Sequence, residues 1–158
     1  MERIVVTGGE VVSAAFADGE YMPPSAISDA DIAAAEERYL IPVTGRELYE
    51  SLLDGKYAEL RGEYVVPAVA YAVRAMLQPA LDVRAGVFGT TVPKSSAFGS
   101  ATAEQARELR RAVRTKAHTL LRRLSDHLDA HAAEYPEYRR ERDVLKRCST
   151  DGGIVQVR

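Results

Sequence analysis

The feature that most constrains the fold is a run of helical periodicity that begins at Thr102 and continues to about Ala133. Thr102 and Gln105 have the spacing of a capping box, and Pro136 lies just beyond the end of the run. At 1.5 Å per residue such a helix is roughly 45 Å long. Its apolar side chains recur at helical spacing, at Leu109, Val113, Leu120, Leu124 and Leu128. The sequence therefore predicts a helical fold in which this helix, about 102–133, is the spine.

A second helix is predicted over residues 29–40. Ser28 and Asp31 form an N-terminal cap signature, and the run that they open has apolar residues spaced by three and four. Pro42 is expected to end this helix, because proline lacks the amide hydrogen that a helix interior needs.

Two shorter helices are predicted from local signals. Thr44 and Glu47 have the spacing of a second capping box, and Gly55 is expected to end the short helix that they open. Residues 136–147 are rich in charge and could form a further helix.

A longer run, residues 57–76, also keeps helical spacing. Pro67 should either kink this helix or begin its second part, and Pro79 should end it. The predicted fold class is therefore mainly α: one domain, residues 1–158, with a bundle of four to five helices built on the long one.

Three segments are predicted to be extended. Apolar runs split by residues 7–9, Thr-Gly-Gly, predict that residues 1–27 form an N-terminal arm with a short strand. A small β-hairpin or loop is predicted over about 83–93, with turn chemistry at Gly89. Residues 148–158 are predicted to be a tail that contains a short terminal strand.

The composition is that of a globular protein, with 46% hydrophobic and 28% charged residues. The longest apolar run, residues 65–77, contains Arg74 and is shorter than the roughly 20 residues that a membrane span needs. Cys148 is the single cysteine, and the first residues do not have the pattern of a secretory signal. The sequence predicts an intracellular protein.

Charge is distributed unevenly along the chain. Residues 1–64 contain 13 acids and 5 bases, a balance of −8, and residues 65–158 contain 10 acids and 16 bases, a balance of +6. This polarity suits a protein that joins its own copies, or another partner, acidic face to basic face. Helices that simply differ in charge would give the same count.

A basic ridge is predicted on the long helix, formed by side chains spaced by three and four: Arg107, Arg111, Arg114, His118 and Arg122. We expect it to be a solvated face, or to pair with the acidic part of another copy. Contact with nucleic acid is a further alternative, because arginine suits phosphate. Of these three explanations, nucleic-acid binding is the least favoured, because the chain is net acidic and no aromatic residues are interleaved with the arginines.

His127 and His131 lie four residues apart, so they could supply two ligands to a metal ion. Both lie on or beside the apolar stripe of the long helix, so we predict that they are partly buried edge residues. A metal site would have to be completed by Cys148 or Glu134.

No motif for catalysis or cofactor binding is evident. The opening RIVVTGG is similar to the start of a dinucleotide-binding unit, but Gly9 is followed by Glu-Val-Val-Ser instead of the further glycines that the fingerprint needs. No nucleophile with an adjacent base, P-loop or cysteine cluster appears. The sequence predicts no enzyme, no cofactor and no metal.

Residues 34–53, AAEERYLIPVTGRELYESLL, carry a resemblance to a known family. They are similar to the pattern A-E-x-x-Y-I-x-P-x-x-G-x-x-L-Y-x-x-L of small phage proteins encoded in Bacteroidetes genomes, which resemble head-tail connector, or head-completion, proteins of tailed bacteriophages. Residues 64–71, YVVPAVAY, and 135–138, YPEY, fit in order. The resemblance covers about residues 28–138.

The resemblance implies a mainly α-helical subunit that forms a closed ring between the portal and the tail, with DNA passing through the channel. A ring of this kind needs two different complementary patches on each copy. The candidate subunit interface combines the ridge arginines with apolar edges that a neighbour could complete: Arg107, Arg111, Arg114, Arg122, Val87, Phe88, Ile154 and Val155.

The leading hypothesis is a structural phage or prophage protein of the head-tail junction, a homo-oligomer whose partners are the portal and tail-adaptor proteins. It would be found in the host cytoplasm during assembly and then in the virion. One alternative is a helical nucleic-acid-binding protein that uses the ridge from Arg107 to Arg122. A second is a small metal-dependent hydrolase built on His127 and His131.

Overall fold

The structure is a computed structural model that describes residues 3–16, 22–82, 84–86, 89–91, 103–147, 149–151 and 154–156. The protein is mainly helical, as predicted. Its longest element is α7 (Ala103–Ala130), whose 28 residues span about 42 Å at 1.5 Å per residue. The predicted spine is therefore confirmed, while its expected cap, Thr102, lies outside the described residues.

The N-terminal residues form a helix, so the predicted extended arm is wrong. α1 (Gly8–Ala15) is capped by Thr7, whose hydroxyl accepts from the Glu10 amide while the Glu10 carboxylate accepts from the Thr7 amide. This reciprocal capping turns the glycine pair into the start of a helix. The site at Gly8 is also crowded, because a Cβ there would lie 3.2 Å from the carbonyl oxygen of Pro24, in the short 3-10 helix η1 (Pro24–Ala26).

Residues 29–44 form one continuous helical run that crosses the predicted stop at Pro42. The run consists of α2 (Asp29–Ala35), the π-helical turn η2 (Glu36–Leu40) and α3 (Ile41–Thr44). Ser28 caps α2 together with Asp31, as predicted. The wider π turn gives a physical reason for the error, because it changes the backbone pairing just where the proline lacks a donor.

The same arrangement recurs at Pro67. This run consists of α5 (Ala58–Leu60), the π-helical turn η3 (Arg61–Val65) and α6 (Val66–Asp82). Pro67 is the second residue of α6, so the second part of the predicted helix does begin there. Pro79 lies inside α6, and the predicted stop is wrong. Pro79 lies in the last turn of α6, and its missing amide hydrogen removes a single hydrogen bond there.

The helix α4 (Arg46–Leu53) starts at a glycine, and the predicted Thr44 capping box is wrong. Gly45 is the N-cap and has a φ of 76°, a left-handed conformation that favours glycine. The Thr44 hydroxyl instead donates to the carbonyl of Leu40, 3.1 Å away. Gly55, with a φ of 81°, follows the helix and marks its end as predicted.

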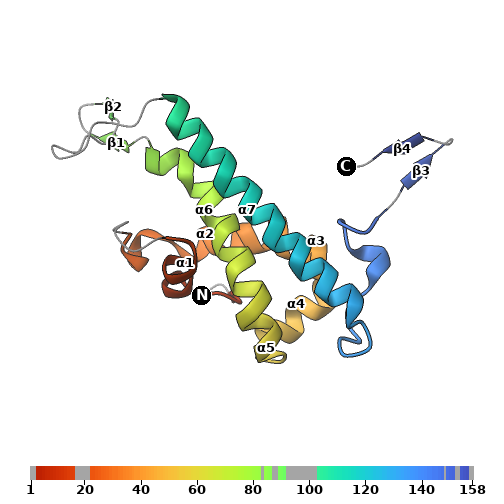
Figure 1. The fold of residues 1–158 in the computed structure, drawn as a ribbon. Helices are drawn as coiled ribbons and strands as arrows, with labels where there is room; N and C mark the ends of the chain where they lie inside the picture. Colours follow the sequence, from red (N-terminus) through yellow and green to blue (C-terminus); the bar gives the residue numbers. More distant parts are fainter. Residues whose placement is uncertain are drawn as a thin grey trace.

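Figure 1 shows α6 and α7 side by side as an antiparallel helical hairpin, and contacts between the two helices support this packing. α1 and α2 pack against α6, and α3 contacts α7. The C-terminal end of α6 and the N-terminal end of α7 extend away from α1 to α5 (Figure 1). The core thus lies between the shorter helices, the N-terminal part of α6 and the C-terminal part of α7.

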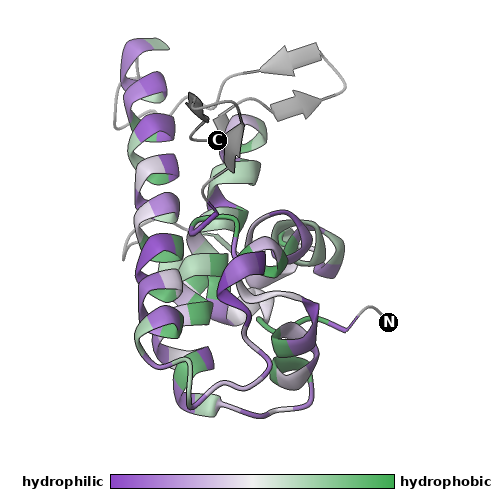
Figure 2. Ribbon diagram, turned by 90° about the vertical axis from the view of Figure 1, so that its right-hand side faces the viewer, coloured by the Kyte–Doolittle hydropathy of each residue, from purple (hydrophilic) through white to green (hydrophobic). Residues whose placement is uncertain are grey.

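The buried face of α7 differs in part from the predicted apolar stripe. Val113, Leu124 and Leu128 are buried as predicted, but Leu109 is 40% exposed and Leu120 is only half-buried. The remaining buried positions of the helix are Ala117, Leu121 and Ser125. Hydrophilic residues dominate the N-terminal part of α7 in Figure 2, because α1 to α5 do not reach that part.

The chain after α7 is held by side chains and contains no α-helix over residues 136–147, so the predicted charged helix is wrong. Turns lead to a single 3-10 turn, η4 (Arg140–Arg142). Tyr135 and Tyr138 are buried against the core, and Asp143 is fully buried. Hydrogen bonds outside the helical pattern hold this segment: the Leu145 amide donates to the Asp143 carboxylate and the Val144 amide donates to the Pro42 carbonyl.

Two short antiparallel ladders complete the described chain: β1 (Arg84–Gly86) with β2 (Gly89–Thr91), and β3 (Ser149–Asp151) with β4 (Ile154–Gln156). Their central pairs are Ala85 with Thr90 and Thr150 with Val155. Within the described residues, no helix combines the length and the apolar character that crossing a membrane requires.

Candidate interaction surface

The predicted basic ridge lies on α7 with every member exposed: Arg107, Arg111, Arg114, His118 and Arg122. The first and last members of the ridge are 15 positions apart on the helix, which is about 22 Å along the axis. The rigid helix fixes the spacing of these side chains, so the ridge is a linear array of positive charge.

The ridge arginines differ from most cations nearby because their charge is not neutralised by any residue that the structure describes. Among the described residues, Arg107, Arg111, Arg114 and Arg122 have no acidic partner within 4.0 Å. By contrast, Arg123 on the same helix binds Glu63 at 2.9 Å. Guanidinium groups that are exposed and unpaired keep all five donors available to a ligand.

The charge polarity of the sequence is partly cancelled inside one copy. Arg142 from the basic part binds Glu47 of the acidic part at 3.1 Å, and Arg123 likewise reaches Glu63. The counts of −8 and +6 therefore overstate the charge that each part can offer to a neighbour.

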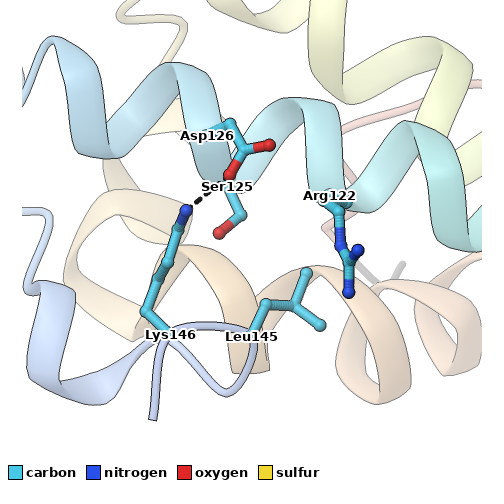
Figure 3. Close-up of a pocket in the computed structure, with 5 residues that line it drawn as sticks. All are labelled: Arg122, Ser125, Asp126, Leu145 and Lys146. Atoms are coloured by element: carbon cyan, nitrogen blue, oxygen red, sulfur yellow. Dashed lines mark hydrogen bonds and ion pairs between the residues drawn. The ribbon is translucent and has the colours of Figure 1, made fainter.

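A surface pocket of about 320 Å³ lies at the C-terminal end of the ridge, lined by Arg122, Ser125, Asp126, Leu145 and Lys146 (Figure 3). The Lys146 amine forms an ion pair with Asp126 on one side of the pocket, and Arg122 lies at the other side (Figure 3). Leu145 is 39% exposed between them. Arg122 is the cation in this pocket without an internal partner.

The predicted histidine pair is brought together by stacking. The His127 ring lies 4.1 Å from the Tyr64 ring and 4.3 Å from the His131 ring, both nearly parallel. His127 Nε2 lies 3.3 Å from the Tyr135 hydroxyl, and His131 Nδ1 lies 3.0 Å from the His127 carbonyl oxygen. Burial is the main cause that lowers the pKa of His127.

This geometry does not resemble a metal centre. The two rings stack face to face, whereas ligands converge on a shared ion. Of the residues that the structure describes, no three His, Cys, Asp or Glu side chains form a group able to hold a metal ion. Cys148, the suggested third ligand, lies outside the described residues.

A buried carboxylate that the sequence analysis missed fixes the N-terminal segment. Glu36 is fully buried, and its Oε1 accepts from the amides of Val5 and Val6 at 2.9 and 3.0 Å. Its Oε2 accepts from the Tyr49 hydroxyl at 2.8 Å. Burial raises the pKa of Glu36, and these three hydrogen bonds oppose that rise. These partners lie 13 to 31 positions away from Glu36 in the sequence, so no local motif could have revealed this role.

A second contact fastens the same segment from outside. Arg61 binds both carboxylate oxygens of Glu10, each at 2.8 Å, and donates from Nε to the Val5 carbonyl at 2.9 Å. The hydrogen bonds from Arg61 are the largest cause that lowers the pKa of Glu10 to about 2. α1 is therefore joined to η3 by a bidentate ion pair.

Asp143 plays the equivalent part for the C-terminal segment. Its carboxylate accepts from the Ser125 hydroxyl at 2.6 Å, the Tyr138 hydroxyl at 2.9 Å and the Leu145 amide at 2.8 Å. Burial and the bond to Asp143 raise the pKa of Tyr138. The Val144 amide donates to the Pro42 carbonyl, which joins this segment to α3.

The apolar members of the predicted interface are not placed by the structure. Val87 and Phe88 lie outside the described residues. Ile154 and Val155 belong to β4, whose backbone pairs with β3, and their side chains are likewise outside the description. The ridge is thus the part of the predicted interface that has a defined geometry.

These contacts define a helical protein in which two buried carboxylates hold the N-terminal and C-terminal segments, and whose longest helix presents a row of arginines without acidic partners among the described residues. Residues 29–145 match the model of a family of unknown function (DUF6712), and the chain belongs to that family. The matched region contains Glu36, Asp143 and the whole ridge, whereas α1 precedes it. No curated protein and no solved structure matches the chain.

Proposed function

We propose that this chain is a structural protein of the head-tail junction of a tailed phage or prophage, of the type encoded in Bacteroidetes genomes. In this role it is a connector or neck subunit that self-associates between the portal and the tail. The observation that carries the proposal is the resemblance of residues 28–138, in which helices, prolines and aromatic residues recur in order.

The places of the resembling residues in the fold support the proposal. Pro42 and Pro67, which belong to two of the resembling stretches, occupy the same local structure, two residues after a π-helical turn. Tyr135 and Tyr138, from the third stretch, are buried against the core. The resembling positions thus carry structural roles in one packed unit, as expected when a family shares a fold.

The shape also suits an assembly subunit. The α6–α7 hairpin extends beyond the shorter helices (Figure 1), so each copy presents more surface than a compact bundle of the same length. The proposed role requires no reaction and no cofactor, and its partners are further copies, the portal and a tail adaptor. The protein would assemble in the host cytoplasm and remain in the virion.

The test is assembly with its partners. Purified protein, alone and mixed with the portal encoded beside it, is followed by light scattering and electron microscopy. We expect weak association alone and closed rings at high concentration or on the portal. A protein that forms no closed ring under either condition would contradict the proposal.

A further inference from the structure

We propose that the arginine ridge of α7 binds the phosphate backbone of duplex DNA without regard to base sequence. The inference depends on the ridge alone, so it stands or fails independently of ring formation. The groups that make the contact are Arg107, Arg111, Arg114 and Arg122.

Charge is the first support. Residues 103–125 contain seven Lys or Arg and two acids, a balance of +5, in a chain whose net charge is −2. The four ridge arginines have no acidic partner among the described residues, so their charge remains available. Arginine presents a planar fork of donors that matches a phosphate group.

Dimensions are the second support. The arginines follow one another at about 6, 4.5 and 12 Å along the helix axis. A duplex carries one negative charge per about 1.7 Å with both strands counted, so a 22 Å length of duplex carries about 13 phosphates. A straight row of guanidinium groups on one helix can therefore contact several phosphates at once.

The neighbouring aromatic rings favour a duplex over a single strand. Proteins that bind single strands stack bases on free aromatic faces. The Tyr64 ring contacts the Arg123 guanidinium and stacks with the His127 ring, and the Lys116 amine lies over the Tyr71 ring. No member of the ridge is aromatic, so the contact is confined to phosphates, which carry no sequence information.

The acidic part of a second copy is a poorer complement. Glu47 and Glu63 are engaged by Arg142 and Arg123 of their own chain. Asp54 and Glu10 are likewise held, by Arg3 and Arg61. A polyanion offers a denser array of charge than a face whose carboxylates are already neutralised in part.

Acidic side chains lie near both ends of the ridge. At the C-terminal end Asp126 and Asp129 form ion pairs with Lys146, whereas at the N-terminal end Glu104 and Glu108 are exposed. These two glutamates would repel the phosphate backbone. Replacing them with glutamine should therefore tighten DNA binding, which a merely solvated ridge would not show.

The experiment measures binding of the full chain to a labelled duplex of about 20 base pairs by fluorescence anisotropy over a range of salt. Four phosphate contacts give a slope of about −3.6 for log affinity against log salt, and each Arg→Gln change in the ridge should reduce it by about 0.9. Two unrelated sequences should bind equally. A single strand is the comparison ligand and should bind more weakly.

A matched control separates the ridge from total charge. Arg107→Gln, Arg111→Gln and Arg114→Gln together remove three exposed positive charges, as do Arg38→Gln, Arg46→Gln and Arg139→Gln elsewhere on the surface. We expect the ridge variant to lose more than tenfold in affinity and the control much less. Thermal melts verify that both variants are folded.

Three outcomes would overturn the inference. The first is no binding of the wild type to duplex DNA at low salt. The second is an equal loss in the ridge and control variants, which would reflect total charge. The third is a ridge variant that keeps its DNA affinity but loses self-association by light scattering, which would identify a second copy as the partner of the ridge.

Discussion

The two halves of α7 are surrounded very differently. One residue of the N-terminal half (103–116) is buried, Val113, whereas five residues of the C-terminal half are: Ala117, Leu121, Leu124, Ser125 and Leu128. Several cations beside the C-terminal half have partners within the chain, among them Arg123 with Glu63, but Arg122 has none among the described residues. Arg107 and Arg111 in the N-terminal half have none among the described residues.

This difference separates stability from binding along a single helix. The C-terminal half buries its leucines and binds the C-terminal segment through Ser125, so substitutions of its buried residues should change the free energy of unfolding. The N-terminal half packs against α6 and exposes its charged residues, so substitutions of these should change binding and leave the fold intact. Four measurements of stability would break or sharpen this comparison.

The largest effect should come from Leu124→Ala. Leu124 is fully buried, and removing its methyl groups loses burial and leaves a cavity, at a cost of about 2 to 5 kcal/mol. Leu109→Ala, in the exposed half, should cost less than about 1 kcal/mol because Leu109 is 40% exposed. Urea unfolding measures both. Equal losses would mean that the halves of α7 do not differ as described.

The next effect concerns the N-terminal segment. Glu36→Gln keeps the shape of the side chain, and its amide oxygen can still accept from Val5 and Val6. The oxygen that accepts from the Tyr49 hydroxyl becomes an NH2 group that only donates, which should cost about 1 to 3 kcal/mol. Glu37→Gln is the control, because Glu37 is the next residue and is exposed. Similar unfolding curves for the two variants would show that the buried carboxylate does not hold the segment.

A smaller effect should appear as a pH dependence of stability. The pKa of Glu10 is lowered from 4.5 to about 2 in the folded protein, so the unfolded chain takes up a proton first as the pH falls. The stabilisation by Arg61 is therefore complete above pH 4.5 and is lost as the pH falls through about 2. Glu10→Gln should flatten the acid limb of a plot of melting temperature against pH. An unchanged limb would contradict the ion pair.

The features that sequence predicted correctly are those fixed by neighbouring residues. The Ser28 cap, the end at Gly55, the long helix and the exposed ridge all depend on spacing within a few turns. Thr7 and Glu10 have the same spacing, but the two glycines between them predicted a turn in an extended arm instead of a helix start.

The features that sequence missed depend on distant contacts. Glu36 meets Val5 and Val6 across 31 and 30 positions, and Arg142 meets Glu47 across 95. Pro42 looked like a helix stop because the π turn before it has no sequence signature of its own. The ridge itself was predictable, whereas its lack of internal partners required the tertiary structure.

The smallest change in stability should come from the ridge, and its sign is informative. Arg107 and Arg111 lie four residues apart, and Arg111 and Arg114 lie three apart, so like charges face each other on the helix surface. Each such pair destabilises a helix by about 0.2 to 0.5 kcal/mol, and positive charge near a helix N-terminus is also unfavourable. Replacing Arg107, Arg111 and Arg114 with glutamine should therefore raise stability by a few tenths of a kcal/mol, measured by urea unfolding at low salt. High salt should remove the gain because it screens the repulsion. A loss of more than about 1 kcal/mol would mean that these arginines support the fold, and the contrast between the halves of α7 would then be wrong.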